Sequence, residues 1–157
     1  MKRAKDHPGI YIPLPLFYVA TFFVAVSLQK LLPLGAVFFH TMAARAIGSV
    51  LILSGVFFLF PAIRQFFTSK NTLITIKSAH SLQTTGIYTI SRNPMYVGLL
   101  LLYLGLSFLM GNWWNLILLP VLVFSIQEYI IKREESYLTR RFGEKYVDYT
   151  VKVRRWL

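Results

Sequence analysis

The sequence of 157 residues contains no cysteine and few charged residues, and both shortages narrow the class of protein. Without cysteine, the chain forms neither a disulfide scaffold nor a thiolate metal site. Charged residues make up 15% of the chain, against about a quarter in an average soluble domain. Hydrophobic residues make up 55%, which excludes intrinsic disorder. The composition therefore indicates a small integral membrane protein with a single domain over 1–157.

Acidic residues are especially scarce, with 6 Asp and Glu against 17 Lys and Arg and a net charge of +11. This basic surplus suits nucleic acid or an anionic membrane surface, and its distribution along the chain separates the two. Three long stretches carry no charge, namely 7–29, 46–63 and 93–127. The last would run about 52 Å as one helix, far beyond a hydrocarbon core of about 30 Å, so it has to fold back.

A polar break in the middle of this stretch, Gly111–Asn115, combines turn formers with tryptophans of the kind found at membrane interfaces. The sequence therefore predicts an all-α integral membrane fold of about four transmembrane helices, each on the short side of the usual ~20 residues. The predicted spans are 10–28, 46–63, 94–110 and 114–131, with a loop at 64–93 and a helical tail at 132–157. Small residues in the second span, among them Gly48 and Gly55, predict the close approach of a neighbouring helix.

The positions of Lys and Arg predict the orientation in the membrane. All except Lys30 and Arg45 fall in the N-terminal segment, the loop or the tail. Both termini and the loop are therefore expected on the cytoplasmic side of the membrane, taken to be a bacterial inner membrane. Because topology accounts for the charge, no nucleic acid partner is expected. The start of the chain also resembles a signal peptide, but Pro13, Pro15 and the length of the apolar run favour an uncleaved anchor.

The two cytoplasmic pieces hold most of the remaining polar residues. In the loop, Thr72–Ile76 has the composition of a short extended segment, and 85–88 that of a turn. The tail continues the fourth helix until Phe142-Gly143 ends it, and a shorter amphipathic stretch follows. Its basic end, which finishes at Trp156, is typical of a segment that lies on anionic headgroups.

Half of the six acids, Glu128, Glu134 and Glu135, fall on one helix at the membrane edge. Pairing along the helix is one explanation, such as Glu128 with Lys132, or Glu135 with nearby arginines. Glu134 shares a face with apolar residues, where a carboxylate is costly unless something positive satisfies it. The acids are therefore candidates for binding a cationic ligand.

The loop ends in Ser91-Arg92-Asn93-Pro94-Met95-Tyr96, where the chain re-enters the membrane. Pro94 suits the first turn of a helix, since its missing N–H costs nothing there. Asn93 before it can serve as the N-cap. Taken alone, this motif is explained by an interfacial arginine, a cap and a helix start.

Together, the loop and the tail resemble a known family. Gly86-Ile87-Tyr88 and the motif 91–96 precede a hydrophobic hairpin, and Arg133-Glu134-Glu135 and Phe142-Gly143 follow it. This order resembles the C-terminal half of the isoprenylcysteine carboxyl methyltransferase and phospholipid methyltransferase superfamily, over roughly 82–156. The resemblance implies an integral membrane methyltransferase, with S-adenosylmethionine held on the cytoplasmic side by the two motifs.

The resemblance also implies which residues bind this cofactor: Asn93, Pro94, Met95 and Tyr96 line its site, and Glu134 holds its polar end. The chemistry of the ligand extends the set, because acids suit its ammonium or ribose hydroxyls, Arg92 its carboxylate, and an aromatic ring such as Phe142 its adenine. The predicted cofactor-binding residues are Tyr88, Arg92, Asn93, Pro94, Met95, Tyr96, Glu134 and Glu135. No metal site is expected from the scattered histidines, and no catalytic residue is assigned.

The identity of the methyl acceptor is left open. The lipid-prenyl branch of the family has an arginine four residues before the first acid, where this chain has Ile130, although Lys132 or Arg133 could replace it. A carboxylate or neutral amine needs no catalytic base. A thiol or hydroxyl needs one, and His80 is the histidine that the loop offers.

The predicted function is an S-adenosylmethionine-dependent methyltransferase acting on a lipid or lipophilic small molecule at the cytoplasmic membrane face. The alternative is a non-catalytic basic membrane protein that docks anionic lipid or a protein partner, which would have no use for Glu134 on an apolar face. A reductase with NADPH is a third possibility, but the phosphates of NADPH require cations where this chain has two acids. The oligomeric state is open.

Overall fold

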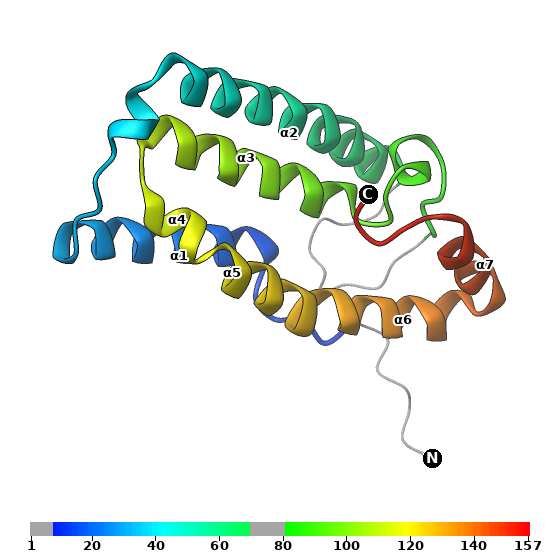
Figure 1. The fold of residues 1–157 in the computed structure, drawn as a ribbon. Coiled ribbons are helices and arrows are strands. Elements are labelled where there is room, and N and C mark those ends of the chain that lie inside the picture. Colours follow the sequence, from blue (N-terminus) through cyan, green and yellow to red (C-terminus); the bar gives the residue numbers. More distant parts are fainter. Residues whose placement is uncertain (1–7, 70–80) are drawn as a thin grey trace.

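The computed structural model describes residues 8–69 and 81–157, and every regular element in these ranges is helical (Figure 1). The longer helices are α1 (Leu14–Leu31), α2 (Met42–Thr68) and α3 (Pro94–Met110). The shorter elements are η1 (Val37–His40), η2 (Gly86–Thr89), α4 (Trp113–Ile117), α5 (Leu119–Ile126), η3 (Gln127–Ile131), α6 (Lys132–Phe142) and α7 (Glu144–Lys152). The all-helical prediction is confirmed for the described ranges, and the extended segment expected at 72–76 lies outside them.

Two of these helices, α1 and α2, are long and apolar enough to cross a membrane, and α3 is a shorter apolar helix. The bounds of α3 agree with the prediction. α1 begins later than predicted, at Leu14, because Pro13 before it is in extended conformation, with φ −61° and ψ 139°. α2 exceeds the predicted 46–63 at both ends. Its earlier start follows from Thr41, which caps the first turn because its Oγ1 accepts a hydrogen bond from the Ala44 amide at 3.2 Å.

The fourth predicted span, 114–131, is not one regular helix. α4 ends at Ile117 and α5 begins at Leu119, and Pro120 in the first turn of α5 has no amide to continue the hydrogen bonds of α4. The π-helical turn η3 then joins α5 to α6, so these elements run on as one long ribbon in Figure 1. α6 ends at Phe142, where Gly143 adopts φ 55°, as the sequence predicted.

α2 and α3 lie side by side along their lengths (Figure 1). Their glycines make this possible, because a Cβ on Gly55 would lie 2.9 Å from the Gly98 carbonyl oxygen, and one on Gly105 would lie 2.8 Å from that of Gly48. Such close backbone contact is typical of membrane helix pairs with small residues at the interface. The predicted packing role of Gly48 and Gly55 is confirmed.

One end of the bundle holds the connections between helices. Gly111 adopts φ 68° after α3, and the Asn112 side chain accepts a hydrogen bond from the Trp114 amide at 2.9 Å. The indole N–H groups of Trp113 and Trp114 donate to the carbonyls of Gly35 and Leu32, both at 2.9 Å. The predicted turn is therefore also the point where the α3–α4 hairpin is tied to the α1–α2 connection.

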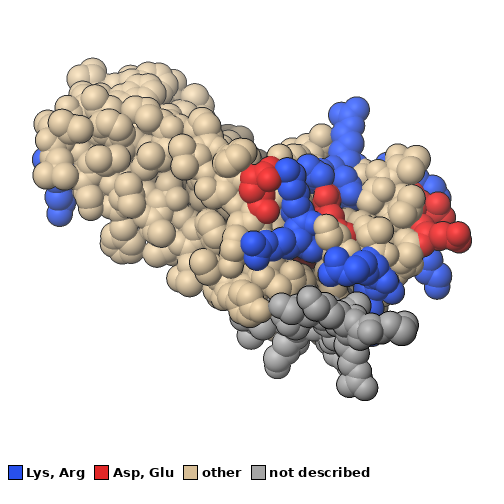
Figure 2. All heavy atoms as spheres, turned by 90° about the horizontal axis from the view of Figure 1, so that it is seen from below, with Lys and Arg blue, Asp and Glu red and all other residues tan. Residues whose placement is uncertain are grey.

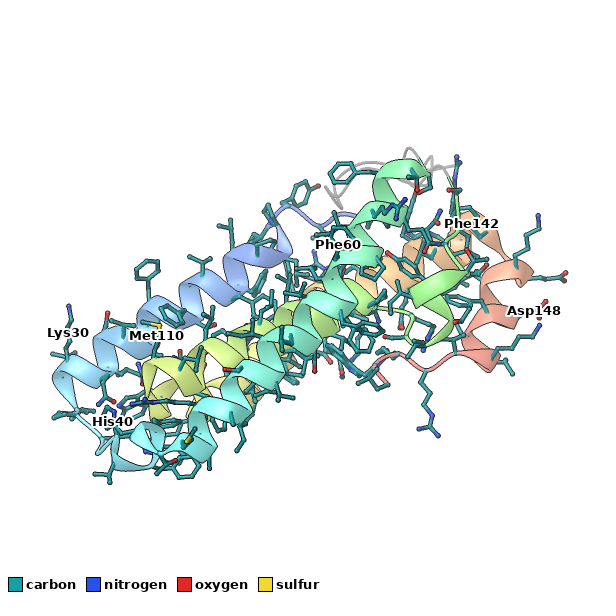
Figure 3. The ribbon with its side chains drawn as sticks, turned by 90° about the horizontal axis from the view of Figure 1, so that it is seen from above. Lys30, His40, Phe60, Met110, Phe142 and Asp148 are labelled. Carbon is teal, nitrogen blue, oxygen red and sulfur yellow. The ribbon has the colours of Figure 1, made fainter. Side chains whose placement is uncertain are left out.

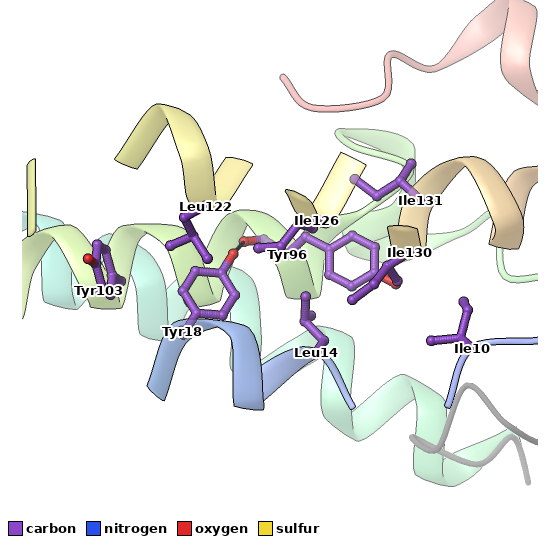
Figure 4. Close-up of a cluster of buried hydrophobic side chains, with 9 residues drawn as sticks. All are labelled: Ile10, Leu14, Tyr18, Tyr96, Tyr103, Leu122, Ile126, Ile130 and Ile131. Carbon is purple, nitrogen blue, oxygen red and sulfur yellow. Dashed lines mark hydrogen bonds between the residues drawn. The ribbon is translucent and has the colours of Figure 1, made fainter. Parts of the chain in front are cut away.

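Charged side chains gather at the opposite end, over α6 and α7, while the rest of the surface in Figure 2 shows few of them. Figure 3 shows the two ends of the molecule, with Lys30, His40 and Met110 at one and Phe142 and Asp148 at the other. Between the two ends lies a buried cluster formed by α1, α3, α5 and η3 (Figure 4). Within it, the Tyr18 hydroxyl donates to the Tyr96 carbonyl at 3.2 Å and ties α1 to the first turn of α3.

Candidate functional site

A cavity lies at the charged end, between the loop before α3, the helix α6 and the tail. Its volume is about 80 Å³, and it opens to solvent. Its lining, called the polar cavity below, consists of Phe66, Ser81, Leu82, Gln83, Tyr88, Arg92, Asn93, Glu134, Glu135, Leu138, Tyr146 and Tyr149. Both predicted motifs therefore contribute to one cavity.

A second cavity, of about 180 Å³, lies next to it toward the apolar body of the molecule. Its lining, called the apolar cavity below, consists of Pro13, Leu14, Pro15, Leu59, Ile63, Phe66, Met95, Tyr96, Leu99 and Glu134. Phe66 and Glu134 line both cavities. The carboxylate that the sequence places on an apolar face is thus at the boundary between a polar and an apolar space.

The side chain of Glu134 is held by α3. The Tyr96 hydroxyl donates a hydrogen bond to its Oε2, and Tyr96 is fixed in turn by the buried cluster of Figure 4. Burial raises the pKa of Glu134 above its ordinary value, and the neighbouring Glu135 acts in the same direction, while the hydrogen bond from Tyr96 opposes them. The described residues give Glu134 no cation within ion-pair distance.

Glu135 has the opposite environment, although it is adjacent in sequence. Arg155 donates to it from Nε at 2.9 Å and from Nη2 at 2.8 Å, in the forked geometry typical of strong arginine–carboxylate pairs. Arg92 adds a third contact, with its Nη1 3.3 Å from Oε1. This hydrogen bonding raises the pKa of Arg155. Glu135 therefore joins three parts of the chain: the loop, α6 and the tail.

Backbone contacts of the tail hold the loop as well. The Arg92 amide donates to the Arg154 carbonyl at 2.9 Å. The Arg155 carbonyl accepts from the side chains of Ser91 at 3.3 Å and Asn93 at 3.0 Å. Asn93 stands at the predicted cap position of α3, but its side chain makes this tail contact and no capping hydrogen bond. The Asn-Pro motif is consequently positioned by residues about 60 positions away.

The turn η2, which precedes the Asn-Pro motif, is held from two sides. Tyr149 of α7 donates from its hydroxyl to the Tyr88 carbonyl at 2.6 Å. Gln65 of α2 donates from Nε2 to the Thr85 carbonyl at 3.1 Å. Gly86 between them has φ 59°, and a Cβ there would lie 2.9 Å from Gln65 Oε1. The predicted turn at 85–88 is thus confirmed, and its glycine is needed both for backbone conformation and for space.

Two polar atoms of the polar cavity are buried without a hydrogen-bond partner among the described residues: the Tyr88 hydroxyl and the Arg92 Nε. Buried polar groups are nearly always satisfied, so such atoms at a cavity mark where a ligand can bind. Burial raises the pKa of Tyr88, with the nearby Glu134 and Tyr149 adding to it, and raises the pKa of Tyr146 and Tyr149 to about 12. These three phenols therefore keep their protons near neutral pH and can donate hydrogen bonds.

Seven of the eight predicted cofactor residues line the two cavities. Tyr88, Arg92, Asn93, Glu134 and Glu135 line the polar cavity. Met95 and Tyr96 line the apolar cavity, beside Glu134. Pro94 is buried in the first turn of α3 and lines neither cavity. Phe142, at the end of α6, lines neither cavity either. Their role in binding a cofactor stays a prediction.

Three residues of the site are not among those predicted: Tyr146 and Tyr149, which line the polar cavity, and Arg155, which binds Glu135 in its wall. The two tyrosines are spaced by three on an amphipathic helix, which places them on one face, and this was the available signal. The sequence predicts that the basic end of the tail, with Arg155 and Trp156, lies on lipid headgroups. Arg155 instead binds Glu135, and Trp156 packs against the buried cluster.

Comparison with known proteins identifies the family of the chain. Residues 43–145 match the phospholipid methyltransferase family, a range that includes both motifs up to the start of α7. The protein-S-isoprenylcysteine O-methyltransferase of Schizosaccharomyces pombe is 38% identical over 74 residues, which are 47% of this chain and 31% of the relative. Protein-S-isoprenylcysteine O-methyltransferase B of Arabidopsis thaliana is 36% identical over 74 residues, 47% of this chain and 38% of the relative.

An uncharacterized protein of Haemophilus influenzae is 45% identical over 65 residues, which are 40% of this chain and 100% of the relative. The match spans only about a third of the length of the two named methyltransferases. No solved structure matches the chain significantly. Because the family match covers well over half of the chain and both sequence motifs, the chain belongs to the phospholipid methyltransferase family.

Proposed function

We propose that the chain is a membrane methyltransferase that transfers a methyl group from S-adenosylmethionine to a lipid or lipophilic small molecule. The observation that carries this proposal is the pair of cavities that meet at Glu134, one lined mainly by polar side chains and tyrosines, the other mainly by apolar side chains. A charged nucleoside cofactor and a lipophilic acceptor could each occupy the space that suits its chemistry. Bound there, S-adenosylmethionine would supply an electrophilic methyl group on a positively charged sulfur.

The residues of the polar cavity fit this cofactor. The unsatisfied Arg92 Nε and Tyr88 hydroxyl are donors for its carboxylate, and the acids offer acceptors for its ammonium and ribose hydroxyls. Tyr146 and Tyr149 add rings beside the same space, where adenine can stack. Because the cavity measures about 80 Å³ and opens to solvent, a bound nucleoside would extend beyond it toward the solvent.

A lipophilic acceptor is supported by the surroundings of the apolar cavity. An apolar groove of about 320 Å³ lies between α1 and α3. Its lining is Tyr18, Val19, Phe22, Phe23, Leu99, Leu102, Tyr103 and Leu106. Leu99 lines the cavity and the groove, so the two are adjacent. A hydrocarbon chain that begins near Glu134 could therefore continue along the groove, away from the charged end.

The proposal includes a topology. α1, α2, α3 and the run from α4 through η3 would form four spans of a single membrane domain, with the α6–α7 end on the cytoplasmic side of a bacterial inner membrane. The gathering of charge at this end supports that orientation, because Lys and Arg mark the cytoplasmic side (Figure 2). Both termini would then be cytoplasmic.

The test is calorimetric titration of the detergent-solubilised protein with S-adenosylmethionine. We expect the affinity for S-adenosylmethionine to fall about tenfold or more in Glu134→Ala and in Asn93→Ala. Each substitution removes one charge-assisted or buried hydrogen bond. Glu128→Ala is the matched control, since Glu128 pairs with Lys132 at 2.6 Å on the exposed side of the same helical run. Incubation with labelled cofactor and a total lipid extract then shows where the methyl group goes.

The alternative, a non-catalytic protein whose basic tail docks anionic lipid or a protein partner, predicts a different result. It predicts no heat with S-adenosylmethionine and a lipid affinity that decreases with salt. Equal cofactor affinity in the wild type, Glu134→Ala and Asn93→Ala would remove the proposed site.

A further inference from the structure

The loop segment before η2 contributes a neutral amide side chain to the polar cavity. Gln83 belongs to the lining, together with its neighbours Ser81 and Leu82. The Asn-Pro motif and α6 instead contribute charged groups, namely Arg92 and the two acids. A ligand that combines a charged end with a neutral heterocycle would therefore meet a suitable partner for each part. The charged partners are described above, and Gln83 is a polar group that they leave over.

The orientation of the Gln83 amide is fixed by Gln65, near the end of α2. Gln65 Nε2 donates to the Thr85 backbone carbonyl at 3.1 Å. A carbonyl oxygen can only accept, so this end of the Gln65 amide has to be the nitrogen. The same nitrogen donates to Gln83 Oε1 at 3.1 Å, and Gln83 Nε2 donates to Ser81 Oγ at 2.8 Å. The Gln83 amide therefore cannot turn over without placing its own nitrogen against that of Gln65.

Gln83 keeps hydrogen-bonding capacity after these contacts. A carboxamide has two N–H groups and two acceptor lone pairs. Among the described residues, the contacts with Gln65 and Ser81 use one of each. One N–H and one lone pair are left, on neighbouring atoms of the same planar group. Glutamine uses this pair of groups to bind adenine, whose 6-amino group donates to the amide oxygen while a ring nitrogen beside it accepts from the amide nitrogen.

We propose, on the basis of the function proposed above, that Gln83 recognises the adenine base of S-adenosylmethionine and that Gln65 is the positioning residue that fixes its amide. Hypoxanthine, the deaminated form of adenine, has an oxygen in place of the 6-amino group. That oxygen would face Gln83 Oε1, and two acceptors without a hydrogen between them repel each other. Because Gln65 keeps the amide from turning over, Gln83 favours adenine over hypoxanthine.

The other residues around the cavity bind the faces of a base and not its edge. Phe66, Leu138 and the rings of Tyr146 and Tyr149 belong to the same lining. Stacking on aromatic rings tolerates any base, because every base has a π face. A preference between two purines that differ at one edge therefore reports on the edge contact, and stacking contributes about equally to both affinities.

The experiment is calorimetric titration of the detergent-solubilised protein with S-adenosylmethionine and with S-inosylmethionine, which carries hypoxanthine. We expect wild type to bind the adenine compound at least about tenfold more tightly. In Gln83→Met this ratio should approach one, since Met keeps an unbranched chain but lacks the amide. In Gln65→Met it should fall less, because Gln83 keeps its amide but can turn over. Gln127→Met is the matched control, the same substitution in η3 outside both cavities, and should keep the wild-type ratio.

A ratio taken within one variant cancels any loss of folded protein, so damage to the loop alone does not change it. Equal affinities in wild type, or the wild-type ratio in Gln83→Met, would overturn the assignment of Gln83. The wild-type ratio in Gln65→Met would overturn the positioning role of Gln65.

A second pair of ligands separates recognition of the base from the charge on sulfur. S-adenosylhomocysteine and S-inosylhomocysteine carry the same two bases on an uncharged sulfur, so their affinities should differ by the same factor in wild type. Equal affinities for this pair would show that Gln83 does not recognise the base. Binding of none of the four compounds by wild type would instead remove the proposed function itself, and this inference with it.

Discussion

Arg155 donates two hydrogen bonds to Glu135, from Nε at 2.9 Å and from Nη2 at 2.8 Å, and so anchors the end of the tail on α6. The backbone carbonyl of Arg155 also accepts hydrogen bonds from the side chains of Ser91 and Asn93. One residue of the tail thus holds both Glu135 and the Asn-Pro motif. Its removal should affect the polar cavity more than any exposed basic residue nearby.

Arg155→Ala should weaken S-adenosylmethionine binding about tenfold, because Glu135 loses its forked partner and the loop loses part of its support. Arg155→Lys keeps the charge but lacks the planar fork, so its affinity should be intermediate. Calorimetry measures both. Arg154→Ala is the matched control, because the Arg154 side chain is exposed and its backbone carbonyl still accepts from the Arg92 amide. An effect of Arg154→Ala as large as that of Arg155→Ala would contradict the assignment.

The contact of α2 with α3 should not tolerate a side chain at Gly105. A Cβ there would lie 2.6 Å from Ile52 Cγ1 and 2.8 Å from the Gly48 carbonyl, so Gly105→Ala should destabilise the fold by about 1–3 kcal/mol. Thermal unfolding in detergent measures the change. In Gly35→Ala, the added Cβ would have no atom within 4 Å, and the unfolding temperature should be nearly unchanged. Equal unfolding temperatures for Gly105→Ala and wild type would show that α2 and α3 can move apart to admit a Cβ without loss of stability.

The buried carboxyl of Glu134 should make stability depend on pH. Because its pKa is raised from the ordinary 4.5, the folded protein binds this proton more tightly than the unfolded chain. The contribution to stability is then greatest below the unfolded pKa and declines as pH rises through the folded pKa. Thermal unfolding from about pH 4 to about pH 7 should show wild type losing stability relative to Glu134→Gln. A difference that grows in favour of wild type with rising pH would mean that the carboxylate is stabilised in the fold.

Loss of the Tyr149 hydroxyl should loosen the turn η2. In Tyr149→Phe, the Tyr88 carbonyl loses its 2.6 Å hydrogen bond while the ring stays, so unfolding should become easier by about 1 kcal/mol. Cofactor affinity should fall as well, because Tyr88 lines the polar cavity. Tyr129→Phe serves as the control, since the ring contact of Tyr129 with Arg133 survives the substitution. Unchanged stability and affinity in Tyr149→Phe would show that η2 is held by its other contacts.

Local patterns sufficed for much of the fold and for part of the site. The span at 94–110, the end of the helix at Phe142-Gly143, and the packing glycines follow from hydropathy, turn residues and residue size, which act within a few positions. The break near Pro120 was missed, because an apolar run shows the same hydropathy whether or not its helix is continuous. Helix ends at Thr41 and Thr68 were missed for a related reason, since charged residues end a hydropathy run but not a helix.

By itself, the sequence determined that the chain is apolar and helical, that most of its charge lies at one end, and that its motifs are those of a methyltransferase family. Only the tertiary structure decided that Glu135 is neutralised by Arg92 and Arg155 while Glu134, its neighbour, faces two cavities. The physical reason is that adjacent residues on a helix point in directions about 100° apart, as 3.6 residues per turn requires. The partners that each one meets belong to segments far away in the chain, and only the packing of helices brings them together.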